Sequence, residues 1–430
     1  MAIVIAGAML GSLPQISLAG TLEIHQKKLA NGVQVVVSEN PTQWLTAVEF
    51  WVRAGSAFEG PEEGGAAHFL EHVLFKGTRS RPPGTVDLEI ENVGASLAAQ
   101  TSKDWARFYT TVATEYLDTV MDIMADIIQN PLFDIGEADV ERRIIKSEIV
   151  GRRFEPKQIL SDALARKLYP SHPYTRPVYG TILNAESITP RILREFHQRT
   201  YVGPAITIVV VGNVEKDTIF ERLEKLFSGV APAAAAPWPP VPARPAEMVE
   251  ENLPKAPGDQ EWIGFAFMGP GMDKPKDVWA VDVLSVLLAR RGGGRLHDRL
   301  VTRDETAAGV DVNFLTQRLP AMISIPIAVN PGTLARVESA VREEIEKLRS
   351  EPVSQAELDM AKRYLLGTYA FEVETAEGQA ASLGFYSVLG DVEDSLNYTR
   401  NITAVTADEV QKAAAEYLDP RGMVIVRLSE

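Results

Sequence analysis

The 430-residue sequence contains no cysteine. Its absence excludes structural disulfides, cysteine-ligated metals and a thiol nucleophile. Any transition-metal site must therefore be built from His, Asp and Glu side chains. Histidine is also scarce, because the chain has only six residues of this type: His25, His68, His72, His172, His197 and His297. A catalytic or metal-binding histidine cluster consequently has few places in which to form.

Long hydrophobic runs and long blocks of like charge are missing as well. Beyond the first residues, no stretch reaches the ~18 uninterrupted apolar residues that a membrane-spanning helix needs, so we expect no membrane span in the mature chain. Charged residues make up 23% of the chain, and the net charge is −15. Because an acidic surface repels phosphate backbones, nucleic acid is not an expected partner.

The beginning of the sequence has the pattern of a secretory signal. Residues 2–10 are apolar or small throughout, and Ser17-Leu18-Ala19 is a small-x-small cleavage pattern. We therefore predict a signal peptide at residues 1–19 and a periplasmic or secreted location. The positively charged start that such signals usually have is missing, and an ordinary buried segment is the alternative interpretation.

A proline-rich segment divides the remaining chain. Residues 231–245 contain six prolines, which cannot sustain a helix or a central strand. We predict a stiff, extended linker at residues 231–246. The flanking segments, 20–230 and 247–430, are then expected to be separate domains of similar size.

The two predicted domains end in the same pattern. At residues 189–211 and again at 406–428, a Thr at a helix N-cap is followed by a helix, the sequence Tyr-x-x-Pro and a strand. Internal duplication is the natural explanation for this repeat.

The local hydrophobic patterns indicate an α+β fold. Helical periodicity is found at 63–75, 87–93, 115–129, 136–152, 278–289, 332–349 and 354–369. Strand patterns are found at 46–53, 108–112, 263–267 and 321–328, together with a hairpin at 28–37.

The motif His-Phe-Leu-Glu-His lies at residues 68–72, inside a predicted helix. Residues i and i+4 share a helix face, so the imidazoles of His68 and His72 can reach one ion from the same side. Glu71, three residues after His68, points near the same ion. A tetrahedral catalytic zinc needs three protein ligands and one open position. The third ligand must therefore be a His, Asp or Glu from elsewhere in the chain.

Glu141 and Glu148 are the best candidates for this third ligand. They are seven residues apart on a predicted helix and share a face, with Ile144 and Ile145 on or beside the same stripe. Two carboxylates on a half-buried face cost desolvation energy unless a cation compensates them. A solvated face with basic neighbours is the alternative, and the residues alone leave both interpretations open.

These motifs make the sequence similar to the inverted-motif zinc peptidases, which carry His-x-x-Glu-His and include pitrilysin, insulysin and the mitochondrial processing peptidase. The resemblance extends to the segments 52–56, 75–78 and 168–174 and covers most of residues 22–430. The length resembles that of the short processing-peptidase-like subunits. The resemblance thus implies two homologous α/β-sandwich domains with mainly antiparallel sheets and helices, joined by the proline-rich linker.

The resemblance also implies a role for each candidate. His68, His72 and Glu148 would be the ligands of one Zn²⁺ per chain. Glu71 would be the general base that activates water for attack on a peptide substrate. Glu141 would be a second catalytic carboxylate near the site, outside the set of ligands.

An edge strand pairs with the extended substrate in this family. The corresponding residues are Ala98, Ala99, Gln100 and Thr101, which we predict to bind substrate. The family usually has Asn-Ala-x-Thr here, so Ala98 replaces an Asn. Backbone pairing survives this change, whereas a side-chain contact with the substrate is lost.

A second departure lies in the predicted C-terminal domain. Active family members usually carry an Arg and a Tyr, seven residues apart, after a Gly-rich segment. The Gly-rich segment is present at 290–296, but the pair reads Val301 and Ala308, whose side chains cannot donate hydrogen bonds. Since the processing peptidase needs two different subunits, a homologous sister chain in a heterodimer would supply the Arg and Tyr.

Two other hypotheses have to be weighed against a peptidase. A non-catalytic scaffold subunit of the same family would tend to lose the ligand set, which is complete here. A metal-binding protein without turnover would not need Glu71, because binding of zinc does not require that residue.

Overall fold

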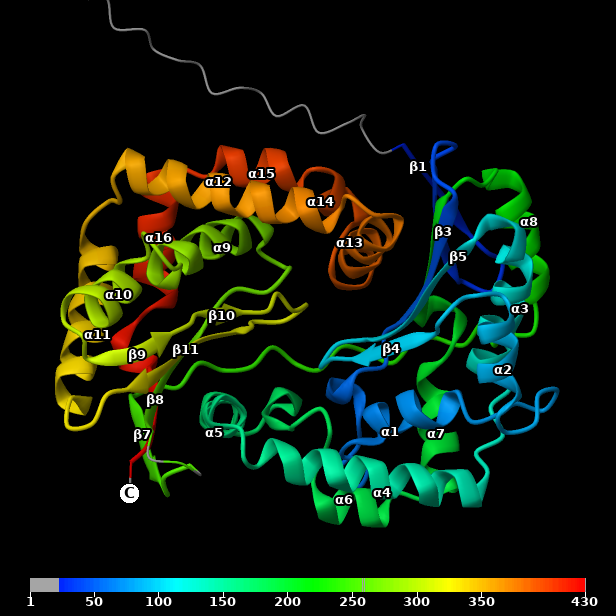
Figure 1. Ribbon diagram of the computed structural model, residues 1–430, viewed down its shortest axis with the longest axis horizontal. Coiled ribbons are helices and arrows are strands. Elements are labelled where there is room, and N and C mark those ends of the chain that lie inside the picture. The colour runs from blue at the N-terminus through cyan, green and yellow to red at the C-terminus, as the bar shows by residue number, and fades with distance from the viewer. Residues whose placement is uncertain (1–22, 257, 259, 430) are drawn as a thin grey trace, which may run out of the picture.

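The computed structural model describes residues 23–256, 258 and 260–429. The predicted signal peptide at 1–19 therefore lies outside the described residues. In the described part of the chain, none of the helices combines the length and the apolar character that crossing a membrane requires. Two halves lie side by side, each built on one sheet (Figure 1).

The first half contains a six-stranded sheet with the order β1-β2-β6-β3-β5-β4. Its strands are β1 (Ile24–Lys28), β2 (Gln34–Glu39), β3 (Leu45–Val52), β4 (Ala98–Thr101), β5 (Ala106–Ala113) and β6 (Ile206–Gly212). All neighbouring strands are antiparallel except β2 and β6, which are parallel. The helices of this half are α1 (Ala66–Leu74), α2 (Thr85–Asn92), α3 (Leu117–Gln129), α4 (Ile135–Arg152), α5 (Pro156–Leu168), α6 (Ile182–Ser187), α7 (Pro190–Thr200) and α8 (Lys216–Leu226).

The second half contains the sheet β10-β11-β8-β12-β7, with β9 also paired to β11. Its strands are β7 (Val249–Leu253), β8 (Glu261–Met268), β9 (Ala307–Val310), β10 (Asn313–Phe314), β11 (Met322–Val329) and β12 (Val424–Leu428). Its helices are α9 (Pro275–Ala289), α10 (Arg295–His297), α11 (Leu334–Ser350), α12 (Gln355–Glu372), α13 (Ala376–Leu389), α14 (Val392–Leu396), α15 (Tyr398–Ala404) and α16 (Ala407–Tyr417). A π-helical turn, η5, covers Asp298–Arg303.

The central strands of the two sheets are arranged in the same way, which supports the predicted duplication. Strand β6 is parallel to β2 and antiparallel to β3, and β12 is likewise parallel to β7 and antiparallel to β8. These two strands are the ones that follow the repeated helix and Tyr-x-x-Pro pattern. The predicted two-domain α+β fold is therefore confirmed.

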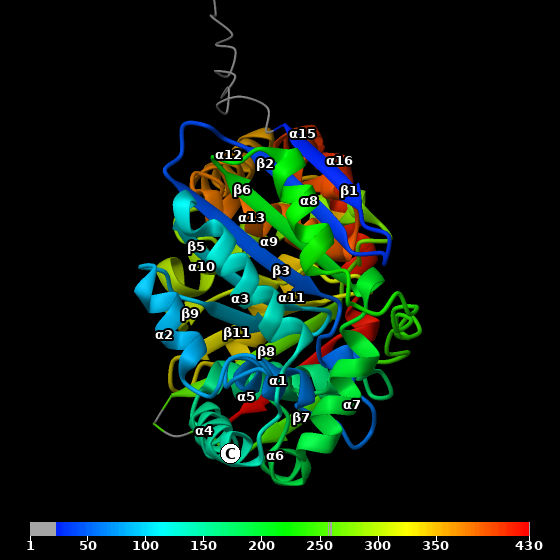
Figure 2. The ribbon, with the colours of Figure 1, turned by 90° about the vertical axis from the view of Figure 1, so that its right-hand side faces the viewer.

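One helix from each half packs on the sheet of the other half. Helix α13 packs on β3 and β6 of the first sheet, whereas α5 packs on β8, β11 and β12 of the second (Figure 1). Helices α3 and α8 cover the other face of the first sheet (Figure 2). Because β6 is covered on both faces, every one of its residues is buried, and apart from Thr207 its sequence is apolar rather than alternating.

Glycines permit the close approach of both exchanged helices. A Cβ atom at Gly384 on α13 would lie within 3.0 Å of three indole atoms of Trp51 on β3. A Cβ atom at Gly264 on β8 would lie 2.9 Å from Leu164 on α5. Neither position has room for a larger side chain without displacement of its neighbour, so the contact between the halves depends on these glycines.

The proline-rich segment 231–246 contains neither helix nor strand. Its course is fixed against the first half by Arg53. The guanidinium of Arg53 donates a hydrogen bond of 2.9 Å to the carbonyl oxygen of Ala236, and it lies over the ring of Trp238 at 5.1 Å. Trp238 also packs against Phe58. The linker is thus held along its length rather than hanging free.

Element boundaries follow the predictions within a few residues, and the shift at the start of α1 has a clear cause. Helix α1 begins at Ala66, three residues after the predicted start. Gly65 has a φ of 87°, which a helix cannot include, so the helix begins after it. Helix α3 likewise begins two residues late, after a single 3₁₀ turn at Thr114–Tyr116.

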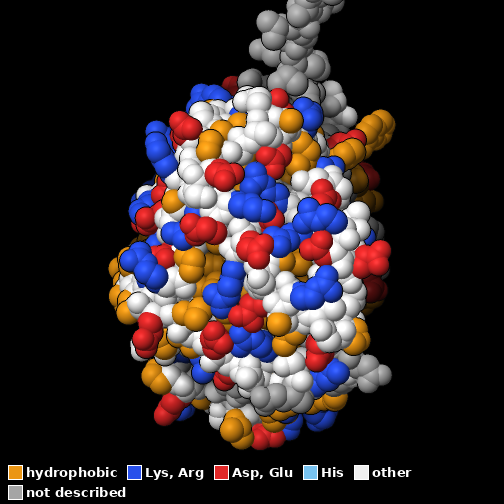
Figure 3. All heavy atoms as spheres, turned by 90° about the vertical axis from the view of Figure 1, so that its left-hand side faces the viewer, with side chains coloured by type: hydrophobic (Ala, Val, Ile, Leu, Met, Phe, Trp, Pro, Cys, Tyr) orange, Lys and Arg blue, Asp and Glu red, His pale blue; other side chains and the backbone are white. Residues whose placement is uncertain are grey.

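The surface of the second half carries both signs of charge. Figure 3 shows Lys and Arg side chains interspersed with Asp and Glu over this face. Several of these charges form short ion pairs, such as Arg299 with Glu343 and Arg342 with Glu338. The chain has a net charge of −15, but its acidic side chains do not form a continuous negative patch on this face.

Candidate active site

The start of helix α1 is fixed by a glycine and a buried carboxylate. A Cβ atom at Gly65 would lie 3.1 Å from the backbone of Gly180, so only glycine fits. The carboxylate of Glu59 accepts hydrogen bonds of 3.0 Å from the backbone N–H groups of Gly65 and Ala67. These bonds satisfy two of the free N–H groups at the helix start and hold the following turn, which carries His68, in place.

The predicted ligands come together where α1 packs on α4. The Nε2 atoms of His68 and His72 lie 3.6 Å and 3.8 Å from Oε2 of Glu148. All three ligand atoms lie within 4.8 Å of one another, and this is the only such group of His and acidic residues in the part of the chain that the structure describes. Two atoms bound at about 2.0–2.1 Å to one tetrahedral ion are roughly 3.4 Å apart. The donor set and its spacing therefore fit a zinc ion.

Glu141 lies behind these ligands and orients one of them. Its Oε2 atom is 2.9 Å from Nδ1 of His72, and its side chain is buried. Nδ1–H donates to this carboxylate, so Nε2 of the same ring is left to face Glu148. A carboxylate that holds a histidine in this way is the usual support of a metal ligand. Lys76, at 3.2 Å from the other oxygen of Glu141, compensates its buried charge.

Burial also sets the protonation of His68. Desolvation, with the nearby charges of His72 and Arg152, lowers the pKa of His68 to about 3. The imidazole is therefore neutral at physiological pH, which is the form that binds a metal.

Glu71 faces the same site from one side of α1. Burial raises the pKa of its carboxyl group, while its interaction with Thr101 on β4 and the neighbouring His72 lower it. Its Oε2 atom is buried and has no hydrogen-bond partner among the described residues. A carboxylate oxygen left open beside the ligand atoms is available to accept a proton from a reacting water.

A cavity of about 370 Å³ opens between the two halves beside this group. His68, Glu71 and three residues of β4 line it, namely Ala99, Gln100 and Thr101. Met322 on β11 contributes to the wall from the second half. Strand β4, which also includes Ala98, is the edge strand of the first sheet, so one side of its backbone is open to a partner in the described structure.

Val301 and Ala308 do not lie in the wall of this cavity. Val301 belongs to η5 and packs against the second core, and Ala308 lies exposed on β9. Arg299 cannot substitute for the missing Arg, because its guanidinium is paired with Glu343 and Glu344. The described chain thus brings no Arg and Tyr from this segment to the cavity.

Four titratable residues of the cavity wall were missed by sequence reasoning: Lys103, Arg152, Asp162 and Tyr179. Arg152 could have been found, because it lies one helical turn after Glu148 on α4. The other three lie on segments without a distinctive pattern. Burial lowers the pKa of Lys103 to about 8, yet its ammonium group is fully engaged, with hydrogen bonds to the carbonyl oxygens of Tyr174 and Arg176.

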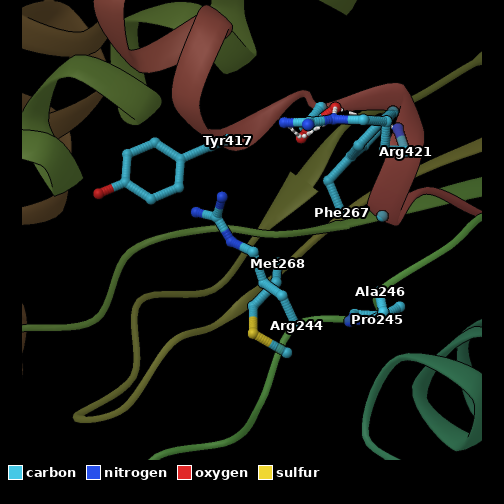
Figure 4. Close-up of a pocket in the computed structure, with 9 residues that line it drawn as sticks. Arg244, Pro245, Ala246, Phe267, Met268, Tyr417 and Arg421 are labelled. Atoms are coloured by element: carbon cyan, nitrogen blue, oxygen red, sulfur yellow. Dashed lines mark hydrogen bonds and ion pairs between the residues drawn. The ribbon is translucent and has the colours of Figure 1, made fainter.

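A second cavity, of about 200 Å³, lies where the linker passes the second half (Figure 4). Its two arginines are already neutralised. Arg244 pairs with Glu416 and lies over the ring of Tyr417, and Arg421 pairs with Asp419. The carboxylate of Asp419 in this pocket is thus held by Arg421, and no histidine lines the pocket, in contrast to the cavity beside His68.

Comparison with known proteins agrees with this geometry. The family described as insulinase (peptidase family M16) matches residues 34–182, and the one described as peptidase M16 inactive domain matches residues 187–365. An uncharacterized zinc protease of Mycobacterium leprae is 28% identical over 91% of this chain and 89% of its own length. The probable mitochondrial-processing peptidase subunit beta of Arabidopsis thaliana is 26% identical over 94% of this chain and 78% of its own length.

Solved structures show the same fold. The crystal structure of a protease from Helicobacter pylori superposes with a TM-score of 0.88 at 23% identity and covers 95% of this chain and 100% of that one. A peptidase M16 inactive domain from Pseudomonas fluorescens gives a TM-score of 0.83 at 22% identity, with coverage of 94% and 97%. The first family match lies within the first half, and the second covers the end of the first half and much of the second. The chain belongs to the insulinase family of peptidases, family M16.

Proposed function

We propose that this chain is the zinc-holding subunit of a peptidase that hydrolyses unfolded peptides together with a homologous sister subunit. The observation that carries the proposal is the convergence of three ligand atoms, from His68, His72 and Glu148, next to the open carboxylate of Glu71. Relatives named zinc protease and processing peptidase support it.

Zinc bound by these three residues would supply Lewis-acid chemistry at a peptide carbonyl and would make a water molecule more acidic. Glu71 accepts a proton from the attacking water and then delivers it to the leaving amine. Glu141 keeps the ring of His72 in the orientation that binding requires. The buried Oε2 atom of Glu71 is shielded from bulk solvent.

The substrate is proposed to add to the edge strand β4. An extended peptide can pair with the free side of this strand through its own backbone, and Ala99, Gln100 and Thr101 place its reacting segment beside Glu71. Ala98 provides no side-chain hydrogen bond, so backbone pairing carries most of this contact. Only a chain segment without tertiary structure can take such a conformation, which restricts substrates to unfolded peptides.

Replacement of Glu141 tests the support of the metal site. We expect Glu141→Gln to weaken zinc binding about 10- to 100-fold, because the amide no longer holds His72 as a charged acceptor does. Zinc affinity is measured by competition with a chromophoric chelator. Asp139→Asn, at an exposed position on the same helix, is the matched control and should leave the affinity unchanged. Equal affinities in the two variants would contradict the role of Glu141.

The requirement for a sister subunit is tested by reconstitution. Val301 and Ala308 offer no hydrogen bond to a substrate, so we expect a co-encoded homologous chain that carries the Arg and Tyr to raise peptide hydrolysis about 10- to 100-fold, the value of hydrogen bonds to a charged group. Turnover is measured with an unfolded fluorogenic peptide for the chain alone, the sister alone and the mixture. A full rate from this chain alone would contradict the heterodimer.

A scaffold subunit is the second candidate function. It is favoured by the loss of the Arg and Tyr pair and by the match to the family described as inactive domain. It predicts that zinc is bound but that no pairing of subunits produces turnover. The reconstitution experiment therefore separates the two functions directly.

A further inference from the structure

Arg152 occupies an unusual position beside the candidate metal site. It is the last residue of α4 and lies one turn after Glu148. Its side chain lines the cavity together with His68 and Glu71. The guanidinium lies over the ring of Tyr179, 4.6 Å from its centroid. Tyr179 is fixed in turn, because its hydroxyl donates a hydrogen bond to Asp162. The guanidinium is thus oriented by an aromatic ring that cannot easily move.

The other charges in the cavity wall are already used. Lys103 donates hydrogen bonds of 2.6 Å and 2.9 Å to two backbone carbonyls. Asp162 accepts hydrogen bonds from Tyr179 and Gln158. Glu71 faces the metal ligands. By contrast, the guanidinium of Arg152 makes no hydrogen bond and no ion pair with any of the residues 23–256, 258 and 260–429, although it lies over the ring of Tyr179.

The guanidinium of Arg152 has no protein acceptor, so its N–H donors are free to bind a ligand that enters the cavity. Arg152 is a partly buried residue, whereas the neighbouring Arg153 is exposed. An Arg side chain carries five N–H donors in one plane, and two of them can bind the two oxygens of a carboxylate side by side. The cavity also provides apolar wall atoms from Ala165, Val178 and Met322, which suit the methylene groups of a bound side chain.

We propose that Arg152 is a specificity-determining residue that binds a carboxylate of the peptide substrate close to the scissile bond. This inference rests on the proposed function of the same site. A substrate paired with β4 directs alternate side chains to one side, and Ala99, Gln100 and Thr101 of that strand line the cavity that holds the guanidinium. The carboxylate comes either from a Glu side chain or from the C-terminus of the peptide.

The proposal is tested without turnover by comparing the binding of peptides that are matched except for one residue or one terminus. The zinc-loaded Glu71→Gln variant, with its sister subunit where hydrolysis requires one, is titrated with labelled unfolded peptides. The peptides differ by Glu or Gln at one position at a time, over three residues on either side of the cleavage point, with a free or an amidated C-terminus. Fluorescence anisotropy gives each affinity.

We expect one position to favour Glu over Gln by about 10- to 100-fold, as a charge-assisted hydrogen-bonded pair does. A further Arg152→Gln replacement should reduce this ratio to about 1, and Arg152→Glu should favour Lys at the same position. Arg153→Gln is the matched control and should keep the ratio. Because unfolded or zinc-free protein cannot acquire a preference for Lys, the Arg152→Glu variant separates loss of this contact from loss of folding.

Each outcome either supports or overturns the inference. Sensitivity to C-terminal amidation instead of to Glu would assign the carboxylate to the peptide terminus. Equal affinities for Glu and Gln peptides at all positions and for both termini, or a ratio unaffected by Arg152→Gln, would overturn the proposal, as would the absence of binding. If wild-type protein showed no hydrolysis in any pairing while the ratio behaved as expected, the proposed peptidase activity would fail and the carboxylate site would stand.

Discussion

Glu71→Gln is expected to lower peptide hydrolysis by up to about 10⁴-fold, the upper range for loss of a general base, while zinc stays near one per chain. The amide has almost the shape of the carboxylate but cannot accept the proton of an attacking water. The three ligand atoms of His68, His72 and Glu148 remain in place. Turnover is measured with the sister subunit present, and zinc content by elemental analysis of the same samples.

Two further variants distinguish loss of the general base from loss of zinc. Glu148→Gln removes a ligand and should lose zinc and activity together. Glu62→Gln, at an exposed position before α1, should change neither. Activity close to wild type in Glu71→Gln would exclude Glu71 as the base. Loss of zinc in that variant would instead make it part of the metal site.

Gly384→Ala is expected to destabilise the protein by about 1–3 kcal/mol, as overpacking of a filled core does. The added methyl group would come within 3.0 Å of the indole of Trp51. That ring cannot retreat easily, because its Nε1–H donates a 2.8 Å hydrogen bond to buried Glu49 and it makes an edge contact with the ring of Trp105. The free energy of unfolding is measured by urea denaturation of the isolated chain.

Gly367→Ala is the matched control for this prediction. Gly367 also lies inside a helix, α12, but a Cβ atom there has no neighbour within 4 Å. The substitution should stabilise the protein by about 0.5–1 kcal/mol, since Ala is the better helix former. Both variants gain the same helix propensity, so the difference between them measures packing between the halves. Equal effects would show that α13 does not press on Trp51.

The chemistry of α1 could be predicted because it depends on local geometry. Spacing of four residues places His68 and His72 on one helix face in any helix. The sequence placed Ile144 and Ile145 on or beside the stripe of Glu141, and the structure distinguishes the two positions. Ile145 is buried, but Ile144 is 43% exposed, because it lies farther round the helix.

Contacts between distant segments could not be predicted in the same way. Nothing in the sequence states that α13 covers the first sheet and α5 the second, since both helices are apolar on more than one side. The proximity of Arg152 to His68 depends on how α4 crosses α1, which spacing along one helix does not determine. Resemblance to a family provided Glu148 as the third ligand, whereas the residues alone left it open. The roles of these residues stay predictions until the variants are measured.

The exchange of helices also sets the order of events during synthesis. The last strand of the first sheet ends at Gly212 and α13 begins at Ala376, so ~164 residues separate them. At about 5–20 residues per second, a nascent chain waits on the order of 10–30 s before this helix emerges. Throughout that interval the inner face of the first sheet, including Trp51 and Val209, has no cover from α13. The first half therefore completes its folding only after translation of the second is nearly finished, and its apolar face is the surface that a chaperone would need to protect.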